Sequence, residues 1–265
     1  MRTFKYLLLL AGVFIVALYS SGRSASNSGQ FQDFTLTLAT PKASYLELQP
    51  IPIVITLKNE TNEPLVGHGG LEFGTGLLRL FIDSGGGPQE VSVSPFTMNV
   101  VALPREFKPG EEVQKLDRLS FKLNKAFPQP GTYRMHVQLL SNDGKESVSS
   151  KPIEVEIVEP DGLDAHALKF IRENSDPAYF YTGIRAVKKA EQLQVLENFV
   201  AIYGESTYAE EAEFALGEVQ FAKRDYEKAR KFFEKLSKKS DYAFAKEAFD
   251  YLKQIEREER KKDHP

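Results

Sequence analysis

Apolar and polar residues alternate along the first half of the chain and recur at helical spacing along the second. The alternation is clearest over Ile51–Lys58, where isoleucine or leucine occupies every second position. A period of two is typical of strands with one buried face. The same period returns in further short segments: Phe34–Leu38, Leu78–Ile82, Leu119–Leu123, Tyr133–Leu139 and Ile153–Ile157.

Turn signals separate these segments, at Pro109-Gly110, Pro130-Gly131 and Asn142–Gly144. An Asp-Gly pair between two alternating segments predicts a hairpin. Roughly seven to nine short strands with no helical interruption predict an antiparallel β-sandwich over residues 31–159.

The period changes within Val158–Gly162, and we place a domain boundary there. Helical spacing then continues over residues 162–262, with a longer helix expected at Val187–Tyr203 and Gly204 as its C-cap. The aromatic run Pro177–Tyr181 predicts a plug that packs the sandwich against the helices. A ligand-stacking surface is the alternative interpretation of that run.

The strongest helical pattern covers Ser206–Asp241 and predicts two helices. Lys223–Asp225 forms the turn between them, and Asp225 is expected to cap the second helix. Gly217 in the first helix is expected to face Ala229 in the second, because neither residue holds the two backbones apart.

Residues 188–255 resemble the tetratricopeptide repeat, a helix-turn-helix unit of about 34 residues. The resemblance rests on Leu216, Gly217, Phe221, Tyr226, Ala229 and Phe233. A second copy is indicated by Ser206, Tyr208 and Ala209, which return at the same period as Ser240, Tyr242 and Ala243. Two positions depart from the pattern, since Glu213 replaces the first-helix Trp and Asp241 the closing Pro. The resemblance implies a helical array that acts by binding other proteins.

Residues 31–158 resemble bacterial immunoglobulin-like modules, through Phe107–Glu111 and Pro130–Tyr133. Tyr133 is then expected as a corner tyrosine whose hydroxyl bonds back to the backbone. This resemblance implies no activity. The expected fold class is therefore multidomain, β then α: an N-terminal antiparallel immunoglobulin-like β-sandwich, followed by a TPR-like α-helical hairpin array.

Residues 1–25 have the layout of a secretory signal. Arg2 and Lys5 precede the apolar run Tyr6–Tyr19, which is followed by small polar residues that permit cleavage after Gly22 or Ser24. A bilayer-spanning helix needs about 20 apolar residues, so a short uncleaved anchor is the alternative. We expect an exported protein, located in a bacterial periplasm or cell envelope.

Composition narrows the chemistry. The chain has no cysteine, so disulfides, thiolate metal sites and a cysteine nucleophile are excluded. A formal charge of −3 argues against a nucleic-acid-binding surface.

No catalytic or metal-ligating motif is recognisable. The four histidines are scattered, and no metalloprotease, hydrolase or zinc spacing occurs. The Gly-rich segments Gly67–Gly76 and Ser84–Pro88 lack the following helix that a phosphate-binding loop requires, so they are interpreted as flexible loops. His68 with Glu72 makes a poor metal site, since two ligands on a mobile loop are too few. We therefore expect neither an enzyme nor a cofactor.

Charge separates along the last helices. Residues 205–218 carry five acids and no base, whereas residues 223–239 carry eight bases against three acids. Attraction between antiparallel neighbouring helices is one interpretation, and docking of an acidic partner is the other. The candidate partner-binding residues are Lys228, Lys231, Tyr208 and Tyr242.

Three function classes follow. The preferred one is an exported, non-catalytic protein-protein interaction or scaffold protein, binding its partner through the TPR-like helices. The alternative is a ligand-binding module whose sandwich end loops hold a saccharide or peptide. An enzyme without recognisable motifs is the third.

Overall fold

The computed structural model describes residues 31–94, 103–182 and 190–263. Strands occupy most of the described residues up to Val158. They are β1 Phe34–Ala39, β2 Ser44–Leu46, β3 Ile51–Asn59, β4 Leu65–His68, β5 Leu78–Asp83, β6 Gln89–Val91, β7 Pro104–Phe107, β8 Glu112–Leu119, β9 Gly131–Leu140, β10 Ser147–Ser149 and β11 Ile153–Val158.

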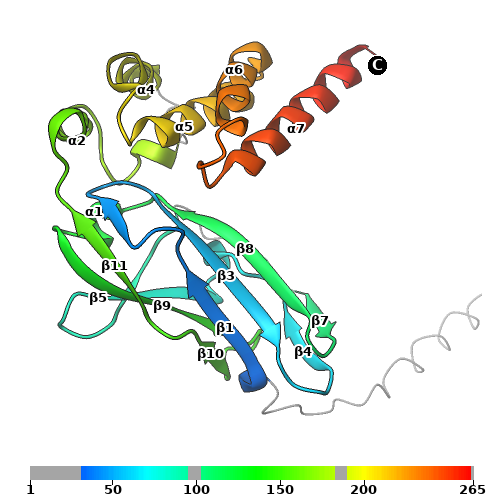
Figure 1. Cartoon of the computed structure of the whole chain (residues 1–265). Coiled ribbons are helices and arrows are strands. Elements are labelled where there is room, and N and C mark those ends of the chain that lie inside the picture. Colours follow the sequence, from blue (N-terminus) through cyan, green and yellow to red (C-terminus); the bar gives the residue numbers. More distant parts are fainter. Residues whose placement is uncertain (1–30, 95–102, 183–189, 264–265) are drawn as a thin grey trace, which may run out of the picture.

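Helices dominate after Gly162. The α-helices are α1 Leu123–Ala126, α2 Gly162–Asn174, α4 Ala190–Tyr203, α5 Ala209–Ala222, α6 Tyr226–Ser237 and α7 Ala245–Asp263, with 3-10 turns η1 Phe31–Asp33, η2 Phe73–Thr75 and η3 Phe180–Thr182. The strands form the lower body in Figure 1, and α4 to α7 lie above them. The predicted order of antiparallel β structure followed by a helical region is confirmed. The expected helix start at Val187 lies outside the described residues.

Two sheets enclose the core of the β region. One has the strand order β1-β3-β8, and the other has the order β2-β11-β9-β5-β6, with β10 also paired to β9. A separate ladder joins β4 to β7. All pairs are antiparallel except β2 with β11.

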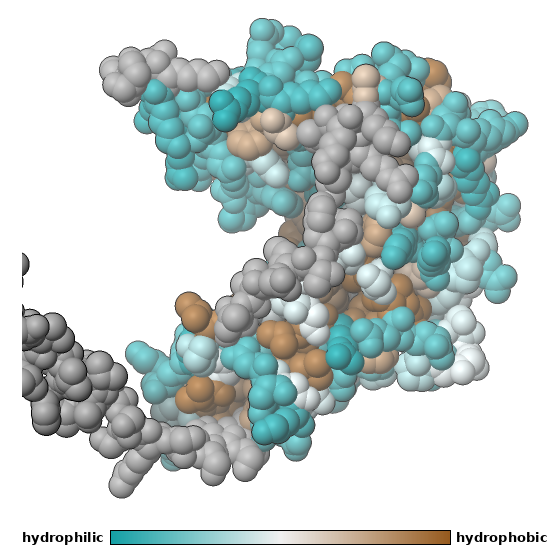
Figure 2. Space-filling model, turned by 180° about the vertical axis from the view of Figure 1, so that it is seen from behind, coloured by the Kyte–Doolittle hydropathy of each residue, from teal (hydrophilic) through white to brown (hydrophobic). Residues whose placement is uncertain are grey.

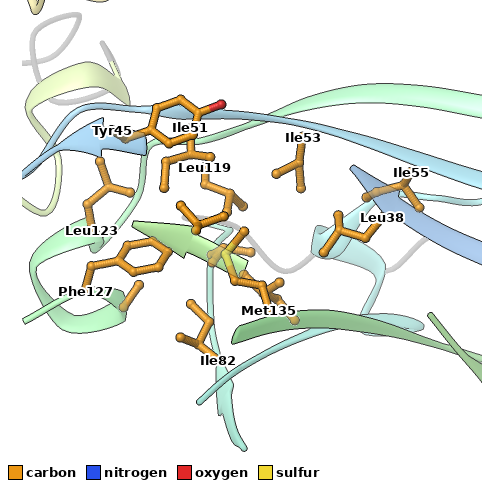
Figure 3. Packing of buried hydrophobic residues seen from close by; sticks show 14 of the residues in the cluster. Leu38, Tyr45, Ile51, Ile53, Ile55, Ile82, Leu119, Leu123, Phe127 and Met135 are labelled. Atoms are coloured by element: carbon orange, nitrogen blue, oxygen red, sulfur yellow. The ribbon is translucent and has the colours of Figure 1, made fainter. Parts of the chain in front are cut away.

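The central strand β3 shows how the alternation sets the packing. Its residues alternate between buried and half-buried along the whole strand. Ile51, Ile53 and Ile55 point inward and meet Met135 of β9 and Ile82 of β5 from the opposite sheet (Figure 3). Full burial of each such side chain stabilises the fold by about 1.5–3 kcal/mol.

Two predicted turn features are present. The Tyr133 hydroxyl donates a hydrogen bond to the Gln129 carbonyl oxygen at 2.7 Å, so the corner-tyrosine contact is confirmed. The hairpin between β9 and β10 closes through the Gly144 N–H, which donates to the Ser141 carbonyl at 2.9 Å. Gly144 has φ of 69°, which glycine adopts without strain.

The first Gly-rich segment is more ordered than predicted. Gly67 and His68 end strand β4 rather than lying in a loop. His68 is buried, and its Nε2 lies 2.7 Å from the Leu140 carbonyl oxygen. Phe73, in the same segment, is partly buried and packs against the core.

Helices α5, α6 and α7 pack in succession. Asp225 caps α6 as predicted, because its side chain accepts the Lys228 N–H. A Cβ added to Gly217 would lie 2.7 Å from the ring of Phe233 in α6, so these two helices approach closely here. That ring also stacks on Tyr251 of α7 at 4.5 Å between centroids, so Phe233 ties the three helices together.

The sheets and the helices share one hydrophobic core. From the helical region it includes Phe180, Tyr181, Phe199, Tyr208 and Leu216. The neighbouring Tyr179 ring lies 5.0 Å from that of Phe121, which follows β8. The aromatic run at Pro177–Tyr181 therefore acts as the predicted plug. Independent folding of the two halves stays a prediction.

Candidate functional site

A cleft of about 370 Å³ lies where the strands meet the helices. Its walls come from the second half of β8, the segment Glu72–Gly74, Glu218 of α5 and Glu247 of α7. Seen from behind, the surface is hollowed between the helical part and the β part (Figure 2). The two halves of the molecule thus contribute jointly to this site.

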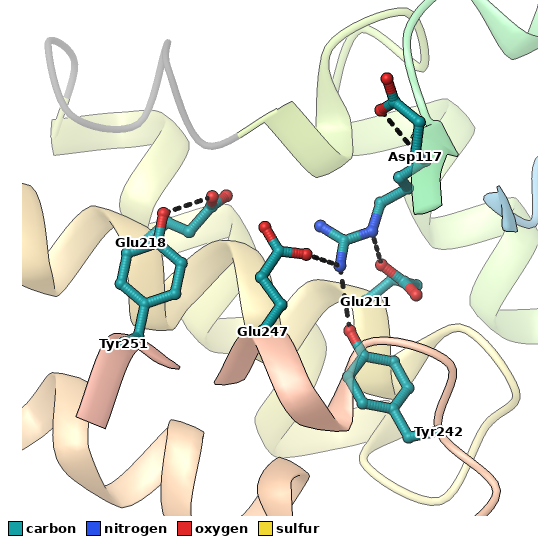
Figure 4. A network of polar contacts seen from close by, with 7 residues as sticks. Asp117, Glu211, Glu218, Tyr242, Glu247 and Tyr251 are labelled. Atoms are coloured by element: carbon teal, nitrogen blue, oxygen red, sulfur yellow. Dashed lines mark hydrogen bonds and ion pairs between the residues drawn. The ribbon is translucent and has the colours of Figure 1, made fainter. Parts of the chain in front are cut away.

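Arg118, near the end of β8, is the centre of a buried polar network beside the cleft (Figure 4). Its Nε lies 2.7 Å from the Glu211 carboxylate of α5, and its terminal nitrogen lies 3.8 Å from that of Glu247. The same nitrogen donates to the Tyr242 hydroxyl at 3.3 Å. One strand side chain therefore binds groups from α5, α7 and the loop between α6 and α7.

Aromatic rings hold the same guanidinium. It lies over Phe214 of α5 at 4.1 Å from the ring centroid and over Phe244, just before α7, at 3.9 Å. A cation over an aromatic face gains about 2 kcal/mol or more when both are desolvated. These ring contacts hold the Arg118 guanidinium in position, in addition to its ion pairs.

Carboxylates outnumber cations around this arginine. Burial raises the pKa of the Glu211 carboxyl to about 7, although Arg118 opposes the change. Burial likewise raises the pKa of Glu218 and of Glu247. Burial would lower the pKa of Arg118, but its acidic neighbours, Glu211 first, raise it. The arginine therefore stays charged, while the carboxyl groups around it bind protons more readily than free carboxyls do.

Among the carboxyl groups around Arg118, Glu218 has the least compensation of its charge. It accepts a hydrogen bond from the Tyr251 hydroxyl at 3.0 Å. Among the ion pairs within the described part of the chain, none includes Glu218. Glu218 also lines the cleft.

The rim of the cleft is held by Lys115. Its ammonium lies 3.3 Å from the Glu72 carboxylate and 3.5 Å from that of Asp117. The Glu72–Gly74 segment, which sequence analysis set apart for its glycines, is thus tied to β8 and lines the same cleft.

Two of the predicted partner-binding residues are corrected. Tyr208 is fully buried between the sheets and the helices. Its hydroxyl donates a hydrogen bond to the Glu47 carbonyl oxygen at 2.7 Å. Tyr242 is also buried, and its hydroxyl belongs to the Arg118 network. Neither tyrosine side chain is exposed in this structure.

Lys228 and Lys231 are exposed on α6, as predicted. Each forms a local ion pair, Lys228 with Asp225 and Lys231 with Glu227. Neither lines the cleft.

The charge separation along the helices has a structural role. Lys235 of α6 pairs with Glu213 of α5 at 2.5 Å. Lys239, just after α6, pairs with Glu210 of α5 at 2.8 Å. Attraction between neighbouring helices, the simpler of the two interpretations, is confirmed for these pairs.

Sequence reasoning missed Arg118, Glu211, Glu218 and Glu247. Glu211 and Glu218 are seven positions apart and therefore share a helix face. Arg118 carries no comparable signal, since a charged residue in an alternating strand normally faces solvent.

Within the described ranges no cluster of three or more potential metal ligands is present. None of the described helices is long and apolar enough to cross a membrane.

Comparisons with known proteins identify no family. No family model and no curated protein matches the chain. Among solved structures, a β-glucosidase from Listeria innocua in complex with isofagomine is 14% identical, with a TM-score of 0.29, over 47% of this chain and 16% of its own. The sporulation control protein Spo0M from Bacillus subtilis is 13% identical, with a TM-score of 0.33, over 53% of this chain and 55% of its own.

A CARDB domain from Pyrococcus furiosus, in complex with di-metal ions, is 14% identical over 49% of this chain and 97% of its own, with a TM-score of 0.28. This chain spans only a small part of the β-glucosidase and about half of Spo0M. TM-scores this low carry no argument about fold or activity.

Proposed function

We propose that this protein is an exported, non-catalytic interaction protein that binds a partner protein in the cleft between β8 and helices α5 and α7. The observation that carries the proposal is the composition of the cleft wall. Both halves of the molecule contribute to it, and buried contacts of Arg118 hold those halves together.

The Arg118 network favours binding over catalysis. Its guanidinium is enclosed by two aromatic rings, two carboxylates and a tyrosine hydroxyl. These mutual contacts hold the groups of the cleft wall in fixed positions. A preformed wall lowers the entropy that binding must overcome.

The two resemblances are part of the proposal. Successive packing of α5, α6 and α7, with Phe233 between its neighbours, supports a TPR-like array. Two sheets around one core, with the Tyr133 corner contact, support an immunoglobulin-like sandwich. Residues 1–25, which lie outside the described residues, have the secretory layout that supports export to a periplasm or envelope.

A ligand-binding module remains the second candidate, and one observation favours it. Glu72 and Phe73, from one of the Gly-rich segments, line the cleft. A peptide or saccharide held by this segment would therefore occupy the same site as the partner protein.

Affinity capture from an envelope fraction tests the proposal, with Leu116→Arg as the cleft variant. Leu116 lines the cleft and is 40% exposed, so a longer side chain fills the cleft without disturbing the core. The matched control carries Lys228→Glu and Lys231→Glu on α6. We expect the cleft variant to lose the captured partner and the control to retain it. Equal capture by the cleft variant and the wild type would refute the cleft as the binding site.

A further inference from the structure

One edge of strand β8 is unpaired in the part of the chain that the structure describes. Among the described residues it pairs only with β3, from Ile51 opposite Leu119 to Lys58 opposite Glu112. Four consecutive residues, Lys115–Arg118, line the cleft. Successive side chains of a strand point to opposite faces, so residues from both faces line a cleft only when it runs along the edge.

The backbone groups along this edge alternate in direction. The Asn59 N–H donates to the Glu111 carbonyl at 3.0 Å, which sets the phase of the β3–β8 ladder. In an antiparallel ladder, hydrogen-bonded pairs recur at every second residue. Lys115 and Asp117 therefore direct their backbone groups toward β3, and Leu116 directs its N–H and C=O toward the cleft.

Two neighbouring residues are consistent with this alternation of backbone hydrogen bonds. Pro52 lies opposite Arg118 and has no N–H to donate, as fits a pair without ladder hydrogen bonds. The outward N–H of Arg118 donates instead to the side chain of Asp117 at 2.7 Å. Leu116, two residues before Arg118, has no backbone hydrogen bond outside the β3–β8 ladder among the described residues.

The walls beside this edge hold more acidic than basic side chains. Four carboxylates line the cleft, and the two cations among its lining residues, Lys115 and Arg118, are already paired. The carboxylates belong to Glu72, Asp117, Glu218 and Glu247.

We propose that the open edge of β8 binds an extended, lysine- or arginine-bearing segment of a partner protein, which joins the sheet as an additional strand. The inference rests on the proposed function and specifies its mode of binding. Backbone hydrogen bonds at Leu116 give affinity, while Glu218 and Glu247 select basic side chains. The exposed Leu116 side chain offers an apolar contact between them.

A short synthetic peptide of alternating threonine and lysine serves as the probe, with a threonine-glutamate peptide as its counterpart. Amide exchange in the full-length protein is followed by NMR. We expect the Leu116 amide to exchange rapidly in the free protein, unlike those of Lys115 and Asp117, and to become protected by the lysine peptide only. Protection of Leu116 in the free protein would show that the chain already pairs this edge, and would overturn the proposal.

Two controls separate strand addition from simple charge attraction. Leu116→Pro removes the outward N–H, whereas Leu116→Ala keeps it. We expect affinity for the lysine peptide to fall about tenfold or more in the proline variant only, as loss of a buried hydrogen bond predicts. A lysine peptide N-methylated at alternate residues should bind the wild type equally poorly. This control needs no variant that must fold, and undiminished binding of the methylated peptide would refute strand addition.

The two proposals fail in different ways. If Leu116→Arg abolishes partner capture while the methylated peptide binds normally, the cleft function stands and strand addition is wrong. If Leu116→Arg leaves partner capture unchanged, the proposed function is wrong whatever the peptides do.

Discussion

At the scale of single residues, the decisive feature is a buried arginine with more acidic neighbours than it neutralises. Arg118 contacts Glu211 and Glu247, and Glu218 lies near enough to raise its pKa. A buried ion pair of this kind contributes less to stability than its contacts suggest, because desolvation opposes the Coulombic gain. Its clearest effect is to fix which groups line the cleft.

The raised pKa of Glu211 predicts a pH dependence of folding stability. The folded protein holds a proton on Glu211 up to about pH 7, whereas the unfolded chain releases it near its ordinary value of 4.5. The free energy of unfolding therefore falls as pH rises through this window, by up to about 3 kcal/mol from this group.

Urea unfolding of the wild type and Glu211→Gln at pH 5 and pH 7.5 measures the effect. Glutamine mimics the protonated carboxyl, so we expect the variant to gain stability relative to the wild type as pH rises. His136, whose pKa is lowered by burial, titrates in both proteins and cancels in the difference. A stability difference that did not change with pH would contradict the assignment.

At the scale of elements, the sequence was informative where one local pattern determines one contact. The alternation of β3 predicted its buried isoleucines, and Asp225 predicted the start of α6. Arg118 could not be found this way, because its partners lie about 90 to 130 residues further along the chain. The close approach at Gly217 was also predicted from the sequence, but not that the ring of Phe233 lies against this glycine.

The α5–α6 contact predicts the effect of overpacking. Phe233 is fully buried and stacked on Tyr251, so it cannot move away from a side chain added at Gly217. We expect Gly217→Leu to lower the free energy of unfolding by about 1–3 kcal/mol or more. Thermal unfolding followed by circular dichroism measures this. Charge reversal at Lys228 and Lys231 is the control, since both are exposed and should leave the melting temperature nearly unchanged.

At the scale of the whole molecule, the shared core joins two regions with different periods. The boundary at Gly162 could be located from sequence, because the period changes there. The extent of contact across this boundary could not be predicted. Tyr208 and Glu47, which are joined by a hydrogen bond, are about 160 residues apart, and neither residue indicates the other in the sequence. The short linker in the sequence predicted only that the two halves are in contact.

The shared core predicts unequal behaviour of the two halves. We expect a fragment of residues 31–160 to keep its β signal, because its isoleucine core is complete. A fragment of residues 161–263 should be helical but melt earlier than in the whole chain, because Phe199, Tyr208 and Leu216 lose their contacts with the rest of the core. Circular dichroism of the fragments and the whole chain decides. Equal melting temperatures for the helices in both settings would show that the shared core adds nothing to their stability.

The open edge of β8 also bears on solubility. An unpaired strand can template association of identical chains, and charged residues beside the edge are a common protection against it. Here Leu116 stands between Lys115 and Asp117, and acidic side chains outnumber basic ones around all three. Two copies approaching edge to edge would bring together more carboxyl groups than cations, so repulsion opposes this association. A basic segment experiences no such repulsion. The same carboxyl groups therefore allow a strand of another protein to bind, while they oppose fibrous self-assembly.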